Sequence, residues 1–282
     1  MRSIAIINQK GGVGKTTTAV NLSAALAATG QRVLLVDLDP QAHATLHLGL
    51  QPDREQKSVY DVLTSGTPLS DVYRAGGDNL YIAPSHIDLA AAEVELVGVV
   101  GREVILRDKL AECRRAFDFV FIDCPPSLGI LTINALAAVD EVFLPLQPHF
   151  LALHGLSKLL ETVELVARRL NDRLRLTGVA LCMYDSGTRL AAEVRRDVEA
   201  YFAASRDGGK PWSNVKIFQT CIRRNIRLAE APSFGQSIFD YAPDSNGALD
   251  YEQLAGEILE DSAVGSRRRN SRTRRAGSRG AA

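Results

Sequence analysis

Few features of this sequence suggest a disulfide-rich, zinc-binding or membrane protein. Its 282 residues include only four cysteines, which lie far apart and form no CxxC pair, so neither a disulfide framework nor a zinc site is indicated. No apolar run approaches the ~18 residues of a membrane span, and a strand-like run begins at residue 2, so we expect a cytoplasmic chain with no membrane partner. We expect buried thiols at Cys113, Cys124, Cys182 and Cys221.

Charges of the two signs balance in total but not along the chain. Seven arginines and no acidic residue follow position 261, whereas the preceding part has 26 basic and 33 acidic residues, so the body carries about −7 and the tail +7. Because a Ser/Arg/Gly/Ala segment cannot bury a core, we expect a disordered basic tail at 263–282 after one domain at 1–262. This tail is either a solvated terminus or an extra nucleic-acid arm.

Apolar strand-like runs alternate with helical segments along the body. This alternation predicts an α/β fold with a mostly parallel sheet and helices on both faces. The near-continuous apolar runs VLLVD, VFID and VFLPL are typical of strands that are buried on both faces. The first helix should end at Gly30, which can adopt the left-handed conformation. The expected strands are 2–7, 32–37, 80–83, 118–123, 141–146, 178–184 and 216–219, and the expected helices are 16–29, 156–170, 190–202 and 249–260.

A glycine-rich loop, INQKGGVGKTTTA at 7–19, joins the first strand to the first helix. Gly11, Gly12 and Gly14 allow backbone N–H groups to face phosphate oxygens at the positive N-terminus of that helix. Lys15 adds a positive charge for the β and γ phosphates, and the Thr16 hydroxyl suits a bound Mg²⁺. The sequence therefore predicts a nucleotide phosphate site at this edge of the sheet.

A second lysine marks this loop as a variant of the common phosphate-binding pattern. The pattern GxxxxGK[ST] requires a glycine at position 9, but this chain has Gln9 followed by Lys10. KGGVGKTT resembles the deviant Walker A motif of the ParA/MinD family of P-loop ATPases, and the likeness covers almost the whole chain. VLLVDLDPQ and FVFIDCPPSLG resemble the family's second acidic loop and its Walker B strand, while MYDSGTRLAAEV and RRNIRLAEAPSFG resemble segments of the chromosomal ParA, or Soj, branch.

The resemblance implies a P-loop NTPase fold and Mg²⁺-dependent hydrolysis of ATP to ADP and phosphate. It implies that Lys15 serves the nucleotide of its own subunit, whereas Lys10 crosses a dimer interface to the partner's phosphates, where a second cation stabilises the developing charge. Asn225 is implied to approach the adenine. The implied nucleotide-binding residues are Lys10, Gly11, Gly12, Val13, Gly14, Lys15, Thr16, Thr17 and Asn225.

Carboxylates at the ends of two strands are the candidates for metal and water chemistry. Asp123 ends an apolar strand, where an unpaired carboxylate is costly, and the resemblance makes it the Walker B residue that holds Mg²⁺. By the same resemblance, Asp39 orients the attacking water and Asp37 supports Thr16 and the metal. From the residues alone, Asp37 or Asp39 could instead be a turn or helix cap.

The resemblance also implies partners beyond the nucleotide. Relatives form a homodimer when ATP is bound, bind double-stranded DNA without sequence preference, associate with the nucleoid, and are released when a ParB-like protein stimulates hydrolysis. Binding through phosphates falls steeply with salt concentration. Arg189 and Arg227 match the DNA-contacting arginines of the Soj branch, and Arg224 is a further candidate. A solvated helix face is the preferred interpretation of Arg195 and Arg196.

The leading hypothesis is thus a chromosome- or plasmid-partitioning ATPase, with a ParA-like ATPase that positions a protein cargo on the nucleoid as the alternative. A MinD-like membrane ATPase would need a C-terminal amphipathic helix, which SRRRNSRTRRAGSRGAA does not provide. A redox protein such as the nitrogenase iron protein would need cluster-ligating cysteines, and Cys124 directly after Asp123 is poorly placed for that.

Three further features of the sequence lead to minor predictions. No DNA-reading domain precedes the loop, so binding to a specific operator is not expected. His154 stands before Gly155, where many relatives have an acidic residue. His43 and His47 have a spacing that can chelate a metal on a helix, but no third ligand type lies nearby.

Overall fold

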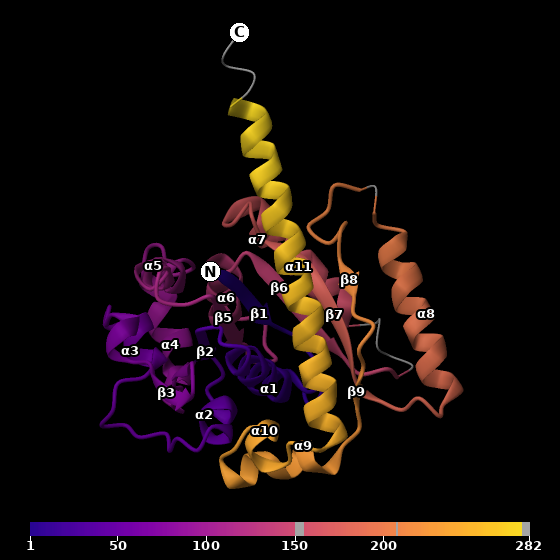
Figure 1. Cartoon of the computed structure of the whole chain (residues 1–282). Coiled ribbons are helices and arrows are strands. Elements are labelled where there is room, and N and C mark those ends of the chain that lie inside the picture. Colours follow the sequence, from indigo (N-terminus) through magenta and orange to yellow (C-terminus); the bar gives the residue numbers. More distant parts are fainter. Residues whose placement is uncertain (150–154, 207, 278–282) are drawn as a thin grey trace.

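A nine-stranded sheet with helices on both faces forms the centre of the molecule (Figure 1). The computed structural model describes residues 1–149, 155–206 and 208–277, with side chains described as far as 261. The strand order is β3-β4-β2-β5-β1-β6-β7-β8, and β9 pairs with β7. The strands are β1 (Arg2–Ile6), β2 (Val33–Asp37), β3 (Arg74–Gly77), β4 (Leu80–Ala83), β5 (Phe119–Asp123), β6 (Glu141–Leu146), β7 (Arg175–Tyr184), β8 (Lys216–Ile217) and β9 (Ile222–Arg223).

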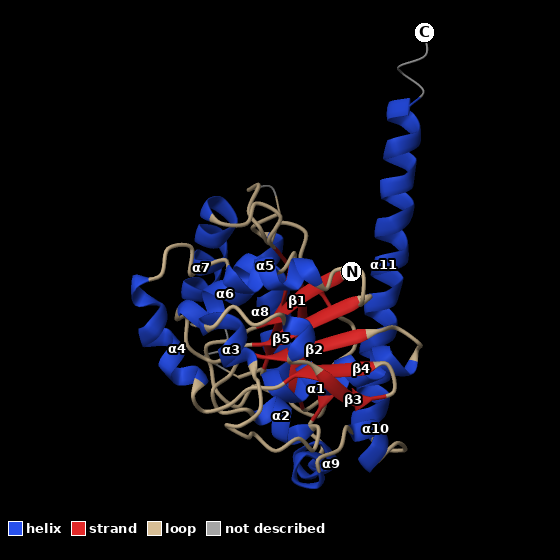
Figure 2. Cartoon of the chain, turned by 90° about the vertical axis from the view of Figure 1, so that its left-hand side faces the viewer, coloured by secondary structure: helices blue, strands red, loops and turns tan. Residues whose placement is uncertain are grey.

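Helices cover the two faces of this sheet in two groups (Figures 1 and 2). Helices α1, α10 and α11 pack on one face, and α3 to α8 contribute to the core on the other. The helices are α1 (Lys15–Ala28), α2 (His43–His47), α3 (Val59–Thr64), α4 (Leu89–Glu95), α5 (Ile105–Glu112), α6 (Ile130–Ala138), α7 (Leu156–Arg169), α8 (Arg189–Ala203), α9 (Ile226–Glu230), α10 (Ile238–Tyr241) and α11 (Asn246–Gly277), with short 3₁₀ turns η1 (Leu69–Asp71), η2 (Leu96–Gly98) and η3 (Ala231–Phe234).

The central strands are apolar along their whole length because both of their faces are covered. All residues of β2 and β5 are buried. Side chains alternate across the sheet, so Leu34 and Val36 enter one core while Val33 and Leu35 enter the other. Every strand pair is parallel except β3 with β4. The predicted fold class, a mostly parallel sheet with helices on both faces, is therefore confirmed.

Element boundaries follow the predictions closely, but two strands and several short helices were missed. Strand β3 contains two glycines, and β9 has only two residues, so neither shows a β-rich run. Strand β7 begins at Arg175, before the predicted 178, and β8 ends at Ile217, before the predicted 219. The first helix stops as expected, because Gly30 has φ 85°.

The C-terminal helix is longer than the sequence predicted. Helix α11 runs to Gly277, where we expected a helix at 249–260 and a disordered tail from 263. Arginine and alanine are good helix formers, and a helix that is already nucleated by packing can propagate through them. The side chains of this extension and residues 278–282 lie outside the described part, so the domain boundary at 262 stays a prediction.

The parallel arrangement brings several strand ends to one edge of the sheet. Asp123 at the end of β5 is in register with Ile6 of β1 on one side and with Asp37 of β2 on the other. The loop that follows β1 and the acidic turn that follows β2 therefore leave the sheet beside each other.

Packing between β6, β7 and β8 allows no side chain at Gly178. The rings of Phe143 and Phe218 stack with centroids 5.4 Å apart, and a Cβ at Gly178 would lie 2.4 Å from the Phe218 ring. We expect Gly178→Ala to lower the free energy of unfolding by about 1–3 kcal/mol because the core cannot accept the methyl group. Urea denaturation measures this. The matched control is Gly256→Ala in α11, where a Cβ meets nothing within 4 Å; a Gly178→Ala protein as stable as the control would contradict the packing argument.

Candidate nucleotide site

The loop between β1 and α1 has the backbone geometry of an anion-binding turn. Gly12 and Gly14 have φ 71° and φ 91°, which are conformations that side chains disfavour. Gly14 caps α1, so the free N–H groups of the first helical turn face the loop. Gly11 and Gly12 are exposed, whereas Val13 is buried and anchors the loop to the protein. The loop can therefore hold phosphate oxygens with backbone donors alone.

Lys15 lies at the base of this loop and is buried. Lys15 is only 7% exposed, and its Nζ donates a hydrogen bond to the Lys10 carbonyl oxygen at 3.4 Å. Burial lowers the pKa of Lys15, while the carboxylates of Asp123 and Asp39 oppose that shift. An ammonium group with few hydrogen-bond partners in such a loop forms strong, charge-assisted hydrogen bonds when a phosphate binds.

Asp123 is the carboxylate that needs a partner. It is fully buried, and neither of its Oδ atoms has a hydrogen-bond partner among the described residues. Burial, followed by the neighbouring Asp37, raises the pKa of Asp123, while the Thr16 hydroxyl and Lys15 act in the opposite direction. A divalent cation would supply the missing charge. The donor set of Asp123 and Thr16 fits Mg²⁺, which prefers oxygen ligands and completes its shell with phosphate and water.

Asp37 is held by the protein itself. Its Oδ2 accepts hydrogen bonds from the backbone N and the hydroxyl of Thr45, at 2.8 and 2.7 Å, and its Oδ1 accepts from the Asp39 N at 3.2 Å. Burial raises the pKa of Asp37 to about 6, against the effect of the Thr45 hydrogen bonds. These hydrogen bonds of Asp37 are those of the turn-cap alternative, and they come from Thr45 and Asp39, not from Thr16. The metal role of Asp37 remains a prediction.

Asp39 lies two residues further along the chain and is also largely buried. It is 9% exposed, its Oδ1 accepts from the Gln41 N at 3.0 Å, and its carbonyl accepts from the Ser85 hydroxyl at 2.7 Å. These contacts fix the turn that follows β2. Within the described residues no group of three or more His, Cys, Asp or Glu side chains converges on a metal position.

A cavity of about 370 Å³ lies beside the loop and can hold a nucleoside. Gly14, Thr17 and Asn225 are among the residues that line it. The Asn225 side chain also caps α9, since its Oδ1 accepts from the Arg227 N at 2.8 Å. Met183, at the end of β7, has φ 53°. The lining residues are Gly14, Thr17, Cys182, Met183, Ile222, Arg223, Arg224, Asn225, Ile226, Leu228, Ala229 and Tyr251.

Two residues of α11 that the sequence did not single out hold this cavity together. Asp250 is buried and accepts from the Arg223 guanidinium at 2.6 and 3.0 Å and from the Arg223 backbone N at 2.8 Å. The Tyr251 hydroxyl is 3.1 Å from the Thr18 hydroxyl. No local sequence pattern connects residues 27 positions apart, so only the fold could reveal that α11 fixes β9.

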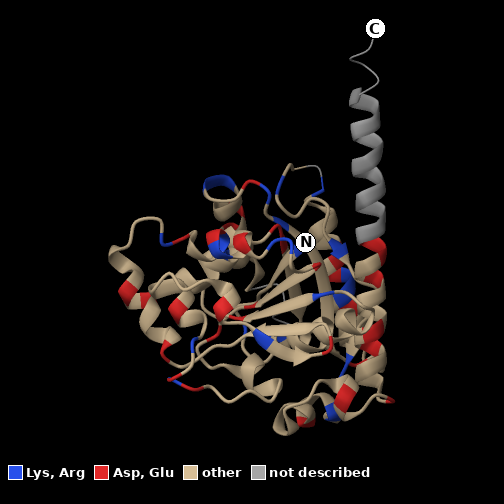
Figure 3. Ribbon diagram, turned by 60° about the vertical axis from the view of Figure 1, so that its left-hand side comes forward, with Lys and Arg blue, Asp and Glu red and all other residues tan. Residues whose placement is uncertain are grey.

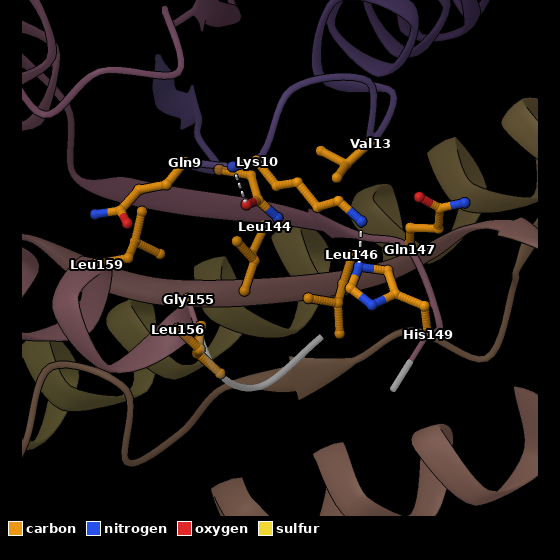
Figure 4. Close-up of a pocket in the computed structure, with 11 residues that line it drawn as sticks. Gln9, Lys10, Val13, Leu144, Leu146, Gln147, His149, Gly155, Leu156 and Leu159 are labelled. Carbon is orange, nitrogen blue, oxygen red and sulfur yellow. Dashed lines mark hydrogen bonds between the residues drawn. The ribbon is translucent and has the colours of Figure 1, made fainter. Parts of the chain in front are cut away.

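The side chain of Lys10 contacts a residue outside the phosphate loop. It is exposed, and its Nζ contacts Nε2 of His149 at a second cavity (Figure 4). His149 was not among the predicted site residues, and nothing in the local pattern marks it. His154, which the sequence did single out in the same segment, lies outside the described residues.

The candidate DNA-binding arginines lie on segments that follow β7 and β9. Arg189 is the first residue of α8 and is exposed, while Arg224 and Arg227 are exposed around the start of α9. Arg227 pairs with Glu230 at 2.9 Å. In Figure 1, α8 begins at the same end of the molecule as α9. The arginines are thus placed at the nucleotide edge, and their contact with DNA stays a prediction.

Arg195 and Arg196 differ from these arginines in their contacts. Arg195 pairs with Glu199 at 3.0 Å and donates to the Phe218 carbonyl at 3.2 Å, whereas Arg196 donates only weakly, to the Ala192 carbonyl at 3.4 Å. Figure 3 shows that acidic residues recur along the described part of α11. Positive charge is therefore not spread evenly over the described surface.

The histidine pair and the cysteines have no converging ligands. His43 is exposed, whereas His47 is buried, and burial lowers the pKa of His47 to about 4. Cys113, Cys124 and Cys182 are buried thiols as predicted, and Cys221 is half-buried. Burial raises the pKa of the Cys124 thiol far above its usual value. Among the described residues, no helix has both the length and the apolar character that a membrane crossing requires.

Comparisons with known sequences agree on one group of proteins. The profile of a family described as an AAA domain matches residues 1–176. The sporulation initiation inhibitor protein Soj of Bacillus subtilis (strain 168) is 49% identical over 256 residues, covering 90% of this chain and 97% of that protein. The chromosome-partitioning ATPase Soj of Treponema pallidum (strain Nichols) is 46% identical over 259 residues, covering 92% of this chain and 97% of that protein.

Solved structures show the same architecture. The cobyrinic acid a,c-diamide synthase of Mycobacterium smegmatis, with bound ATP analogue and magnesium, has a TM-score of 0.80 at 36% identity, covering 94% of this chain and 97% of that one. The cell division ATPase MinD of Pyrococcus furiosus has a TM-score of 0.72 at 28% identity, covering 92% of this chain and 98% of that one. Both relatives are similar to this chain over nearly all of their length.

The unpartnered carboxylate predicts how the protein responds to magnesium. With a non-hydrolysable ATP analogue present, Mg²⁺ should raise the melting temperature of the wild type by several degrees but leave Asp123→Asn almost unchanged, because the amide cannot neutralise a cation. Differential scanning calorimetry measures both. The exposed Asp244→Asn substitution is the matched control. An Asp123→Asn protein that keeps the full Mg²⁺ response would remove Asp123 from the metal site.

Proposed function

Because this chain belongs to the ParA/MinD family of P-loop ATPases, we propose that it is a chromosome- or plasmid-partitioning ATPase of the Soj branch. In this proposal it hydrolyses ATP to ADP and phosphate with Mg²⁺, dimerises when ATP is bound, and binds DNA without sequence preference. A ParB-like protein stimulates hydrolysis and releases the dimer. The observation that carries the proposal is a buried, unpartnered Asp123 beside Lys15 and a glycine-rich loop.

Binding of the triphosphate is assigned to the loop and to Lys15. The glycine backbone and the N-terminus of α1 supply N–H donors, and Lys15 supplies the charge. Burial has removed much of the hydration of the Lys15 ammonium, so its attraction to phosphate is less screened than on the surface. The neighbouring cavity, with Thr17 and Asn225 in its walls, takes the nucleoside.

Thr16 and Asp123 hold the metal, and Asp37 supports them from within the fold. A bound Mg²⁺ neutralises phosphate charge and orients the phosphates for displacement. The hydrogen bonds from Thr45 keep the Asp37 carboxylate in one orientation. Asp37 is the neighbour in register of Asp123 on β5.

Asp39 is proposed to orient the water that attacks the γ-phosphate. Its turn is anchored by the Ser85 hydroxyl and follows the carboxyl end of β2. Lys10 is exposed at the same edge of the sheet, and in the dimer it contacts the partner's nucleotide. A cation brought by the second subunit makes hydrolysis depend on dimerisation.

The role of Asp39 predicts a separation of binding from turnover. Asp39→Ala should bind ATP and dimerise like the wild type, but its hydrolysis rate should fall by about 10²-fold or more because the water is no longer held by a base. Phosphate release and analytical ultracentrifugation with ATP, or with ADP as the control nucleotide, measure the two properties. Normal hydrolysis by Asp39→Ala would refute this role, and a monomer at every concentration of Mg²⁺ and ATP would refute the proposed dimer.

The arginine assignment predicts a selective loss of DNA affinity. Replacing Arg189 and Arg227 by alanine should weaken binding to random double-stranded DNA while the ATP dimer persists. The slope of the logarithm of the binding constant against the logarithm of the salt concentration should become shallower by about one for each lost phosphate contact. Fluorescence anisotropy at several salt concentrations measures this. The matched control replaces the exposed Arg114 and Arg115, which follow α5 at the opposite edge of the sheet. Equal isotherms for the two double variants would remove Arg189 and Arg227 from the interface.

A further inference from the structure

Lys10 has a partner inside its own subunit. Its Nζ contacts the Nε2 atom of His149, which follows β6, and its backbone N donates to the Asn8 side chain at 3.0 Å. Figure 4 shows the two side chains meeting above the apolar residues of a cavity. A lysine that must serve another subunit is thus already held when the subunit is alone.

The cavity under this contact is a defined pocket of about 360 Å³. Strand β6 contributes Leu144 and Leu146, α7 contributes Leu156 and Leu159, and the loop contributes Val13. Of the described residues that line it, only Lys10 and His149 have ionisable side chains. The methylene groups of a lysine can lie on such an apolar surface while the ammonium group stays at the rim.

The contact requires a particular protonation state. A lysine ammonium only donates hydrogen bonds, so Nε2 of His149 must be the acceptor and the imidazole must be neutral. Burial, and then the charge of Lys10, lower the pKa of His149. An imidazolium could not accept from Lys10 and would repel it.

We propose that His149 is a positioning residue that holds Lys10 in its own subunit, and that Lys10 must leave His149 to reach the partner's nucleotide. The role of Lys10 in the partner rests on the proposed function. Before dimerisation the contact keeps the ammonium away from the loop of its own chain. On dimerisation Lys10 exchanges an imidazole nitrogen for phosphate oxygens, which are the stronger acceptors.

The exchange couples dimerisation to proton uptake. When Lys10 departs, the repulsion that disfavours the imidazolium disappears and His149 binds a proton more readily. Lower pH therefore favours the released state of Lys10, and the ATP-bound dimer should become tighter as pH falls from about 8 to about 6. Asp37 titrates in the same range, with a pKa of about 6, so the effect of His149 must be measured as a difference between variants.

The first experiment tests the contact in the single subunit without nucleotide. Histidine ring resonances are followed by NMR against pH, and the spectrum of His149→Gln identifies the His149 signal. Lys10→Gln should shift the titration of His149 to higher pH, while His43 and His86 stay unchanged as internal controls. Lys57→Gln, whose lysine pairs with Asp71 at 3.6 Å, is the matched control. An unchanged His149 titration in Lys10→Gln overturns the proposal whether or not the protein dimerises.

The second experiment tests the exchange in the dimer. With Mg²⁺ and a non-hydrolysable ATP analogue, the wild-type dissociation constant should fall several-fold from about pH 8 to about pH 6. His149→Gln keeps an acceptor but cannot titrate, so its dimerisation should show a weaker pH dependence. Equal pH profiles overturn the inference and leave the partitioning ATPase standing. A wild type that never dimerises, although the NMR titration shows the contact, overturns the proposed function and with it the exchange.

Discussion

The buried acidic edge of the sheet is the constraint on which the rest of the structure depends. Asp123 and Asp37 are fully buried on adjacent strands, and two carboxylates in such a position repel each other and lose their hydration. Thr45 donates a hydrogen bond to Asp37, whereas Asp123 has no hydrogen-bond partner among the described residues and is available to an incoming cation. Folding thereby stores an unfavourable charge that binding of metal and nucleotide relieves.

The two lysines of one loop have different surroundings in the fold, and the proposed function assigns them different tasks. Lys15 begins α1 and is buried among carboxylates, so it can act only on a phosphate inside the loop. Lys10 precedes the glycines, is exposed and rests on His149. In the proposed function, five positions of sequence separate the lysine that binds the nucleotide of its own subunit from the lysine that reaches another subunit.

The features that could be predicted from the sequence are those marked by a local pattern of residues. The glycine loop, the aspartates at the ends of apolar strands and the buried cysteines each have a pattern that a reader of the sequence can interpret. Short elements such as β3 and β9 escaped because two to four residues show no periodicity. Contacts such as Asp250 with Arg223 escaped because they join segments that only the folded sheet brings together.

The amino-acid sequence by itself determined the fold class, the phosphate loop and the family, since these depend on residue type and spacing along one strand, turn and helix. The tertiary structure alone decided which carboxylate lacks a hydrogen-bond partner among the described residues, which residues line the cavity beside the loop, and which residue Lys10 contacts. The physical reason is that burial and pairing are properties of neighbours in space. Asp37 and Asp123 are 86 positions apart in the chain yet in register on adjacent strands.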